Sequence, residues 1–179
     1  MLLLVVDMQK GLFTDDTPRY DTDGVIRRIN RLIEKFRQAK QPVIFIRHDG
    51  PKGDALEPET RGWEIIDALD RLPTDLVIGK RACDSFLDTS LLEAIRGLKE
   101  NRLVITGCAT DFCVDTTVRS AAAKGLETIV AADAHTTADR PHLDAKTIIT
   151  HHNWSWKNLI LPEGEIRVAD TDELVKALF

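Results

Sequence analysis

The amino-acid sequence predicts an α/β fold, a three-layer doubly wound structure in which helices cover both faces of a mostly parallel six-stranded sheet. Short apolar runs rich in β-branched residues recur along the chain, and each is nearly continuous, as expected for parallel strands buried on both faces. Stretches with helical periodicity separate these runs, which is the pattern of strand–helix–strand crossovers. The length of 179 residues fits one domain covering residues 1–179.

Six strands are expected from the apolar runs. The first, residues 2–6, is entirely apolar and is followed by Asp7. The last, residues 165–168, is weaker than the others and precedes the C-terminal helix. The four runs between them cover residues 42–46, 76–78, 102–106 and 127–131.

Five helices are expected around these strands, each from an apolar stripe or from a residue that starts or stops helices. The first carries an apolar stripe from Val25 to Phe36, and the third stops at Gly125, a residue suited to a helix C-terminus. The expected helices are 25–36, one from a cap at Asp88 or Thr89 to Leu98, 112–124, 141–151, and a last one capped by Thr171.

Charge and composition exclude several classes of function. The chain has 24 Lys and Arg against 29 Asp and Glu, a net charge of −5, whereas a nucleic-acid binder needs a basic face. The apolar run at residues 2–6 is too short for a membrane helix, and no basic region precedes it as in a signal peptide. We therefore expect no nucleic-acid partner, no membrane segment and a cytoplasmic location.

The three cysteines are too few, and odd in number, for a disulfide framework, so each is expected to be a free thiol. Cys113 falls in the first turn of the predicted helix 112–124, where unpaired backbone N–H groups and the helix dipole favour a thiolate and can hold an oxyanion. Cys108 lies close to the preceding strand and is expected to be a buried structural residue, and Cys83 is also interpreted as structural. Cys113 is thus the candidate nucleophile.

Two charged residues stand where predicted strands end. Asp7 follows the first strand and Lys80 the third, and the long irregular segment 49–63 follows the second. In open α/β sheets, ligands bind beyond the carboxyl ends of the strands. An acid, a lysine and the Cys113 thiol are therefore expected to converge at this edge.

These residues lie in motifs that resemble the isochorismatase-like cysteine hydrolase family, and the match runs in order through nearly the whole chain. The motifs are Asp7-Met8-Gln9, Gly79-Lys80-Arg81, the segment from Thr106 to Val114, and Asp133-Ala134-His135-Thr136-Thr137.

The resemblance implies a catalytic triad of Asp7, Lys80 and Cys113 on a sheet with strand order 3-2-1-4-5-6. It also implies a cis peptide bond between Ala109 and Thr110, which aims the backbone N–H of Thr110 beside that of Cys113 as an oxyanion hole. A homodimer or larger homo-oligomer is the usual assembly that the family implies.

The expected chemistry is hydrolysis of a small-molecule C–N bond, in an amide or carbamoyl group, through a Cys113 thioester. Asp7 is expected to act as acid and base, and Lys80 as the electrostatic partner of both groups. Two alternatives stay open: an isochorismatase-type ether hydrolase, a class that lacks the nucleophilic cysteine, and a non-catalytic binding or scaffold protein of the same fold.

A substrate pocket is expected around the triad, and no cofactor or metal is expected. No Gly-x-Gly-x-x-Gly follows a strand, and the stretch Arg47-His48-Asp49 does not match the Asp-x-His metal motif of nicotinamidase-like members. The candidate pocket residues are Gln9, Phe13, Arg47, His48, Trp63 and Phe112.

One rival motif is a cysteine phosphatase signature, Cys-x5-Arg-Ser, formed by Cys113, Arg119 and Ser120. A phosphate loop of that kind usually contains glycine and nothing acidic, because backbone N–H groups must curl around the anion. This stretch has no glycine and contains Asp115, so we interpret it as a helix.

Overall fold

The computed structural model describes all 179 residues, and its six strands form one sheet in the order β3-β2-β1-β4-β5-β6. Every neighbouring pair of strands is parallel, so the predicted fold class and strand order are confirmed. The strands are β1 (Leu2–Val6), β2 (Val43–His48), β3 (Leu76–Lys80), β4 (Arg102–Cys108), β5 (Glu127–Thr136) and β6 (Arg167–Ala169).

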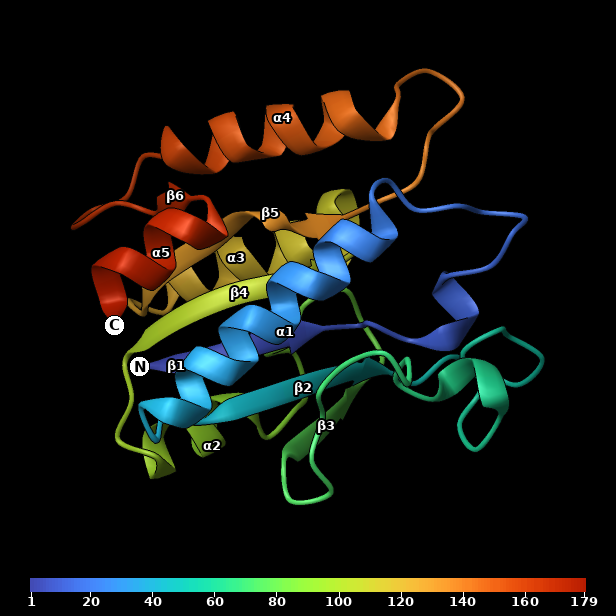
Figure 1. Cartoon of the computed structure of the whole chain (residues 1–179), viewed down its shortest axis with the longest axis horizontal. Helices are drawn as coiled ribbons and strands as arrows, with labels where there is room; N and C mark the ends of the chain where they lie inside the picture. Colours follow the sequence, from blue (N-terminus) through green and yellow to red (C-terminus); the bar gives the residue numbers. More distant parts are fainter.

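Five helices cover the two faces of this sheet (Figure 1). Helices α1 (Thr22–Gln38) and α5 (Thr171–Leu178) pack on one face, and the other three pack on the opposite face. Those three are α2 (Leu91–Gly97), α3 (Asp115–Ala123) and α4 (Ala145–Lys157). None of the helices combines the length and the apolar composition needed to cross a lipid bilayer.

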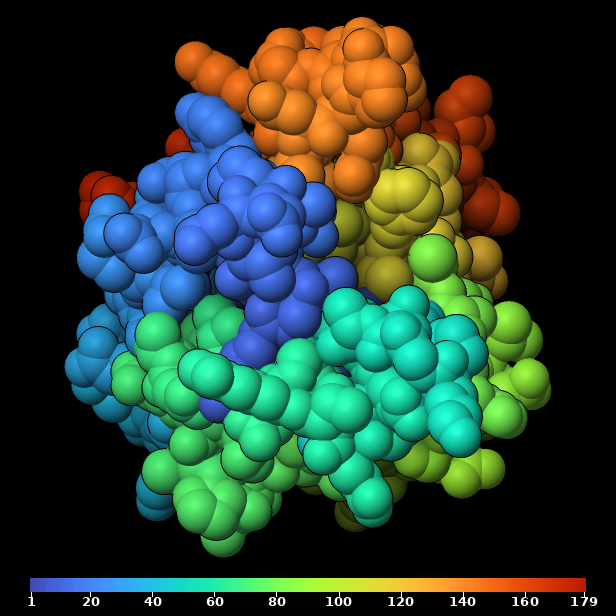
Figure 2. Space-filling model, turned by 90° about the vertical axis from the view of Figure 1, so that its right-hand side faces the viewer, coloured from blue at the N-terminus to red at the C-terminus, as the bar shows by residue number.

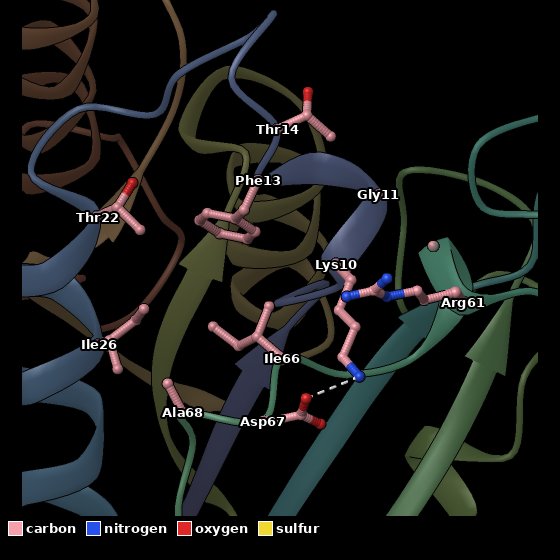
Figure 3. Close-up of a pocket in the computed structure, with 11 residues that line it drawn as sticks. Lys10, Gly11, Phe13, Thr14, Thr22, Ile26, Arg61, Ile66, Asp67 and Ala68 are labelled. Carbon is pink, nitrogen blue, oxygen red and sulfur yellow. Dashed lines mark ion pairs between the residues drawn. The ribbon is translucent and has the colours of Figure 1, made fainter.

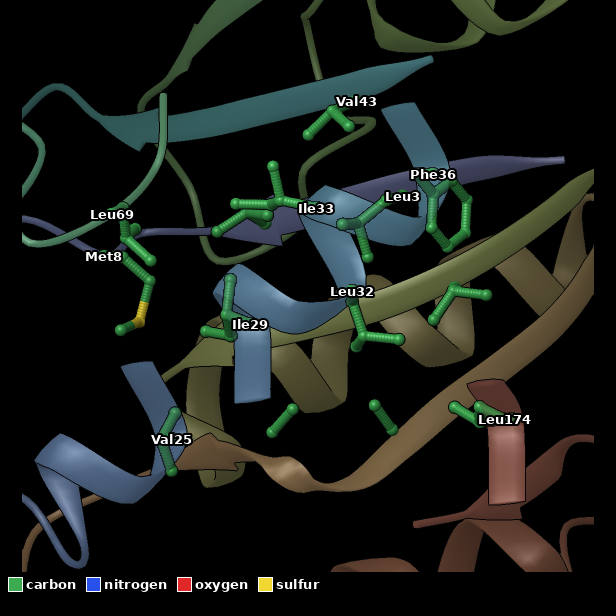
Figure 4. Close-up of a cluster of buried hydrophobic side chains, with 14 of the residues drawn as sticks. Leu3, Met8, Val25, Ile29, Leu32, Ile33, Phe36, Val43, Leu69 and Leu174 are labelled. Carbon is green, nitrogen blue, oxygen red and sulfur yellow. The ribbon is translucent and has the colours of Figure 1, made fainter. Parts of the chain in front are cut away.

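Each face of the sheet has its own apolar core, and the alternation of side chains along the strands divides the residues between them. In β1, Leu3 and Val5 belong to the core under α1, whereas Leu2, Leu4 and Val6 belong to the core under α2, α3 and α4. All five are fully buried, which explains why β1 is a continuous apolar run. Figure 4 shows the α1 core, where Ile29, Leu32, Ile33 and Phe36 of the helix point at the strands.

Two helix starts differ from the prediction. Helix α2 begins at Leu91 with Ser90 at its N-cap position, and Asp88 has a left-handed backbone with φ of 53°. The hydroxyl of Thr89 donates to the Ser85 carbonyl at 2.6 Å and accepts the Leu91 N–H at 3.3 Å, so Thr89 supports the helix start without being the N-cap. Helix α5 has Asp170 at its N-cap position, so the predicted cap Thr171 is the first helical residue.

The other two differences lie in the third and fourth helices. The predicted helix 112–124 is a π-helical turn, Thr110–Val114, followed by α3, so it starts two residues earlier than expected. The predicted helix 141–151 begins later and runs longer, as α4. Asp144 sets that start, because its carboxylate accepts the backbone N–H of Thr147 at 2.9 Å.

The carboxyl ends of the strands all lie at one end of the molecule. Figure 2 views that end, where the blue segment after β1, the cyan segment after β2 and the yellow segment after β4 meet around a hollow. Three short helical turns lie in the segments that follow these strands. They are Lys10–Leu12 after β1, Arg61–Trp63 after β2 and the π-helical turn Thr110–Val114 after β4.

Candidate active site

Strand alternation places Lys80 and His48 on the α3 face of the sheet. Lys80 is two residues beyond Ile78 in β3, and His48 is two residues beyond Ile46 in β2, and both isoleucines belong to the core under α2, α3 and α4. The two residues are paired neighbours in the sheet register. The lysine is therefore delivered, almost fully buried, to the side of the sheet on which Cys113 lies.

Asp7 reaches the same face through a break in strand geometry. Continued alternation after Val5 would point Asp7 toward α1, but its φ of 46° is left-handed, a conformation that aspartate tolerates better than most residues. The carboxylate instead meets Lys80.

Close contact between β1 and β4 brings the Cys113 segment beside Asp7. A Cβ atom on Gly107 would lie 2.0 Å from the Val6 carbonyl oxygen, and the residue has φ of 120°, so only glycine fits here. After β4, a cis peptide bond joins Cys108 to Ala109. The predicted position of this bond, between Ala109 and Thr110, was wrong by one residue, because the cis bond directly follows the last residue of β4. The backbone N–H that follows the cis bond is therefore that of Ala109, and not that of Thr110 as expected.

The three triad residues converge as expected from the strand ends. The Nζ atom of Lys80 lies 2.7 Å from Asp7 Oδ2 and donates to Cys113 Sγ at 3.2 Å. The same ammonium donates to the Ala82 carbonyl at 2.9 Å and lies 3.4 Å from His48 Nδ1. Lys80 therefore holds the acid and the thiol on either side of one buried positive charge.

Burial sets the protonation of these groups. It raises the pKa of Asp7, although Lys80 opposes the rise. Burial, followed by the charge of Asp7, raises the pKa of the Cys113 thiol, although Lys80 again opposes it. Burial alone lowers the pKa of Lys80, but Asp7 and Cys113 outweigh it, so the ammonium stays charged. The position of Cys113 in the first helical turn predicts a thiolate, but the net shift of the thiol pKa is upward, because burial and Asp7 outweigh the ammonium.

The Asp7 carboxylate is fully buried beside the ammonium and the thiol. Its Oδ2 atom faces Lys80, and Lys80 and the Cys113 thiol both oppose the rise in its pKa that burial causes.

The donor atoms of Asp7, His48 and Cys113 lie within 4.8 Å of one another, a spacing that could suit a metal ion. Lys80 Nζ, however, contacts all three of them and supplies the positive charge of the cluster. Burial, reinforced by Lys80, lowers the pKa of His48, so its ring is neutral and can accept from the ammonium. These three groups therefore suit the Lys80 ammonium better than a metal ion.

The other two cysteines differ from Cys113. Cys108 is fully buried, and that burial raises the pKa of its thiol to about 12, which makes it unreactive. Cys83 is half-buried in the segment after β3. Neither is hydrogen-bonded to Lys80, whose partners are His48, Ala82 and Cys113.

Gln9 is a structural brace at the pocket. Its side-chain amide donates to the carbonyls of His48 at 2.9 Å and Trp63 at 3.0 Å, and its oxygen accepts the His48 backbone N–H at 2.8 Å. The side chain is fully buried. Gln9 therefore supports the loop between β2 and β3. Both its amide nitrogen and its amide oxygen are used in these hydrogen bonds.

Arg47 and Trp63 form a stacked pair. Alternation puts Arg47 on the opposite face of β2 from His48, and its guanidinium lies 3.1 Å from the centre of the Trp63 ring. The indole N–H of Trp63 donates to Asp49 at 2.6 Å. Of the predicted pair Arg47 and His48, only His48 reaches the triad.

The two predicted phenylalanines also occupy different places. Phe13 lines a hollow of about 510 Å³ between α1 and residues 61–68, and no triad residue lines it (Figure 3). Phe112 is half exposed next to Cys113, and the Arg140 guanidinium lies 4.9 Å from its ring centre. Phe112 is therefore the predicted aromatic next to Cys113 in the chain.

Sequence reasoning missed a set of residues that brace the turn carrying Cys113. Asp111 accepts from Arg140 at 2.8 and 3.0 Å and from Thr137 at 2.6 Å. Burial opposes ionisation of Asp111, but Arg140 and Thr137 outweigh it and lower its pKa. A second brace joins Thr110 to His135, within a motif that was noted only for its resemblance. The separation of about 25 residues leaves no local signal for either contact.

The chain matches the Isochorismatase domain over residues 1–160. It is 32% identical over 139 residues to a streptothricin hydrolase from Streptomyces noursei, an alignment that covers 78% of this chain and 55% of that protein. It is 30% identical over 168 residues to a ureidoacrylate amidohydrolase from Methylobacterium radiotolerans, covering 74% of this chain and 65% of that protein. A crystal structure of an isochorismatase family protein matches with a TM-score of 0.86 and 30% identity, over 94% of this chain and 97% of that one.

The chain belongs to the isochorismatase family, which confirms the resemblance and the expected enzyme class, a hydrolase of this family. It spans about half the length of the streptothricin hydrolase that it matches. The single-domain organisation, the cytoplasmic location and the homo-oligomeric state stay predictions.

Proposed function

We propose that this protein is a cysteine-dependent hydrolase that cleaves a C–N bond in a small amide or carbamoyl compound. Cys113 is the nucleophile, Asp7 moves the proton, and Lys80 is the electrostatic partner of both. The observation that carries the proposal is the buried ammonium of Lys80, 2.7 Å from Asp7 and 3.2 Å from the Cys113 sulfur.

In the first step, Cys113 attacks the substrate carbonyl carbon while its thiol proton passes to Asp7. Burial keeps the pKa of Asp7 above its usual value, so the carboxylate is a better base than an exposed aspartate. The Lys80 ammonium stabilises the sulfur as negative charge develops on it. Because the cis bond joins Cys108 to Ala109, the backbone N–H that it positions is that of Ala109, and this group and the Cys113 N–H receive the oxyanion of the tetrahedral intermediate.

In the second step, the intermediate collapses and the C–N bond breaks. Protonated Asp7 gives its proton to the nitrogen, which leaves as ammonia or an amine, and a Cys113 thioester remains. Asp7, again a carboxylate, then accepts a proton from water as the water attacks the thioester, and the proton returns to the departing sulfur. Asp7 is placed for this exchange, because its carboxylate lies within 4.8 Å of the Cys113 sulfur.

The relatives support an amide-type substrate. One bears the name streptothricin hydrolase and another the name ureidoacrylate amidohydrolase. Phe112, half exposed beside Cys113, offers an apolar wall for the acyl portion of such a compound.

The test is a screen of small amides, carbamoyl compounds and nicotinamide for release of ammonia. Cys113→Ala is the inactive variant, and Cys83→Ser is the matched control, because Cys83 does not contact Lys80. We expect turnover in the wild type and in Cys83→Ser, and none in Cys113→Ala. Release of ammonia by Cys113→Ala at the wild-type rate would refute the proposal, and hydrolysis of isochorismate by that variant would favour the ether hydrolase.

A further inference from the structure

His48 lies at the triad, yet the mechanism above gives it no task. It is the last residue of β2 and pairs with Lys80 in the sheet register. The Gln9 side chain bonds to its backbone N–H at 2.8 Å and to its carbonyl at 2.9 Å. The next residue, Asp49, donates its backbone N–H to the Lys80 carbonyl at 2.7 Å. The backbone of His48 is therefore held firmly beside Lys80.

Lys80 does not need His48 as a hydrogen-bond partner. An ammonium group has three N–H groups to donate. Asp7 Oδ2 lies 2.7 Å from Lys80 Nζ, the Ala82 carbonyl 2.9 Å and Cys113 Sγ 3.2 Å. His48 Nδ1 is the fourth and most distant of these acceptors, at 3.4 Å. The ring of His48 is thus left free to bond to another group at the site.

The ring of His48 can bond to a water molecule through either nitrogen. Burial, reinforced by the charge of Lys80, lowers the pKa of His48, so the imidazole is neutral at pH 7. A neutral imidazole has one N–H donor and one acceptor nitrogen, and water can pair with both. The ring has no side-chain partner other than Lys80, and the residue is only partly buried, so water can reach it.

The spacing and the burial of the cluster place such a water next to Asp7. A ring nitrogen of His48, a carboxylate oxygen of Asp7 and the Cys113 sulfur lie within 4.8 Å of one another. Two hydrogen bonds of about 2.8 Å that meet at a water oxygen span about 4.6 Å. Asp7 and Lys80 are 1% and 2% exposed, whereas His48 and Cys113 are partly exposed. The ammonium therefore joins these groups on the buried side, and a water bonded to Asp7 and His48 lies on the open side, beside Cys113.

We propose that His48 is a catalytic residue of the second half of the reaction, where it and Asp7 together hold the water molecule that hydrolyses the Cys113 thioester. This rests on the proposed function, which supplies the thioester. The water oxygen bonds to the thioester carbon while its proton passes to Asp7, and the C–S bond breaks as that proton goes on to the sulfur. His48 orients the water by a hydrogen bond and exchanges no proton itself. The attack by Cys113 needs no water, so acylation does not depend on His48.

The test separates the two halves of the reaction with p-nitrophenyl acetate. Acylation of Cys113 releases nitrophenolate in a burst. Hydrolysis of the acetyl thioester sets the steady rate that follows, and the loss of the acetyl group from the isolated acetyl-protein, followed by its mass, measures that hydrolysis alone.

Three variants of His48 distinguish the hydrogen bond from the shape of the side chain. His48→Leu and His48→Phe remove both ring nitrogens and differ in shape, whereas His48→Asn keeps one donor and one acceptor. We expect His48→Leu and His48→Phe to lower the rate of thioester hydrolysis at least about tenfold, with the burst rate within about twofold of wild type. His48→Asn is expected to keep most of both rates.

A second nucleophile distinguishes the loss of a positioned water from damage to the site. Hydroxylamine attacks thioesters without a water molecule in this place, so we expect it to release the acetyl group from His48→Leu as fast as from the wild type. A distorted site would lose the burst as well, and thermal unfolding identifies a variant that is misfolded.

Two results would overturn the role of His48. One is hydrolysis of the acetyl thioester at the wild-type rate in both His48→Leu and His48→Phe, and the other is an equal loss of the burst and of the hydrolysis. A wild type whose Cys113 is never acetylated would overturn it as well. If no amide is hydrolysed in the screen while the acetyl thioester behaves as expected, the C–N hydrolase proposal fails and the role of His48 in thioester hydrolysis stands.

Discussion

Histidine 135 makes the stability of this protein depend on pH in a way that can be calculated. Burial lowers the pKa of His135 from 6.5 to about 4 in the folded protein. Between these values the unfolded chain binds a proton at this residue and the folded protein does not. Folding stability must therefore fall as the pH drops below 6.5, and the loss is complete only below pH 4.

The size of the effect follows from the two pKa values. Between pH 7 and pH 5 the unfolded state gains about 2 kcal/mol from protonation of this one histidine, because each pKa unit is worth about 1.4 kcal/mol. Replacing His135 with asparagine removes the titration and keeps a hydrogen-bond acceptor beside Thr110.

The assay is urea unfolding of the wild type and His135→Asn at both pH values. The variant is destabilised at pH 7, and we expect about 2 kcal/mol of that difference to disappear at pH 5. The other titrating groups are common to both proteins and cancel in the comparison. A difference in unfolding free energy that is the same at pH 7 and pH 5 would show that His135 titrates normally in the fold and would refute this reasoning.

Three further substitutions test the site and its supports. Asp7→Asn should abolish amide turnover, because no base remains for the thiol proton. It should also lower the pKa of Cys113, because the charge of Asp7 raises that pKa, and the alkylation rate measured against pH reports the change. An unchanged turnover would exclude Asp7 as the base. Gln9→Leu should destabilise the fold by about 2 to 4 kcal/mol in urea unfolding, since it leaves buried backbone groups unpaired, and a wild-type stability with a raised KM would indicate substrate contact instead. Arg140→Lys should lose the two-point bond to Asp111 and cost about 1 kcal/mol or less at this partly buried pair. Thermal unfolding measures this loss against Arg119→Lys, a change in a more exposed ion pair.

The sequence alone predicted the fold well because its strands are buried on both faces. A short continuous apolar run such as residues 2–6 is typical of a parallel strand that is buried on both faces. The alternation of such strands with helices along the chain then limits the number of possible sheet topologies. Helix starts were less accurate, since they depend on single side chains. Asp144 begins α4 through one hydrogen bond, and the hydroxyl of Thr89 is used by the preceding turn.

The convergence of Asp7, Lys80 and Cys113 could also be predicted, because all three stand where strands end. The pocket could not, although part of the missing information was present in the strand pattern. Alternation along β2 already separates Arg47 from His48, so only one of them can face Lys80. The role of Gln9 depends on a loop more than fifty residues away, which no local pattern reveals.

The nucleophilic role of Cys113 is tested most directly by the mass of the intact protein during turnover. The protein is mixed with a hydrolysed amide from the screen, quenched in acid and analysed, and the modified residue is located by peptide mapping. We predict an added mass equal to the acyl group of that amide less the one hydrogen that it replaces, located on Cys113 and absent from Cys113→Ala. Two results would contradict the mechanism. One is that Cys113→Ala hydrolyses the amide although it forms no adduct, and the other is an adduct on Cys83 or Cys108 in the wild type.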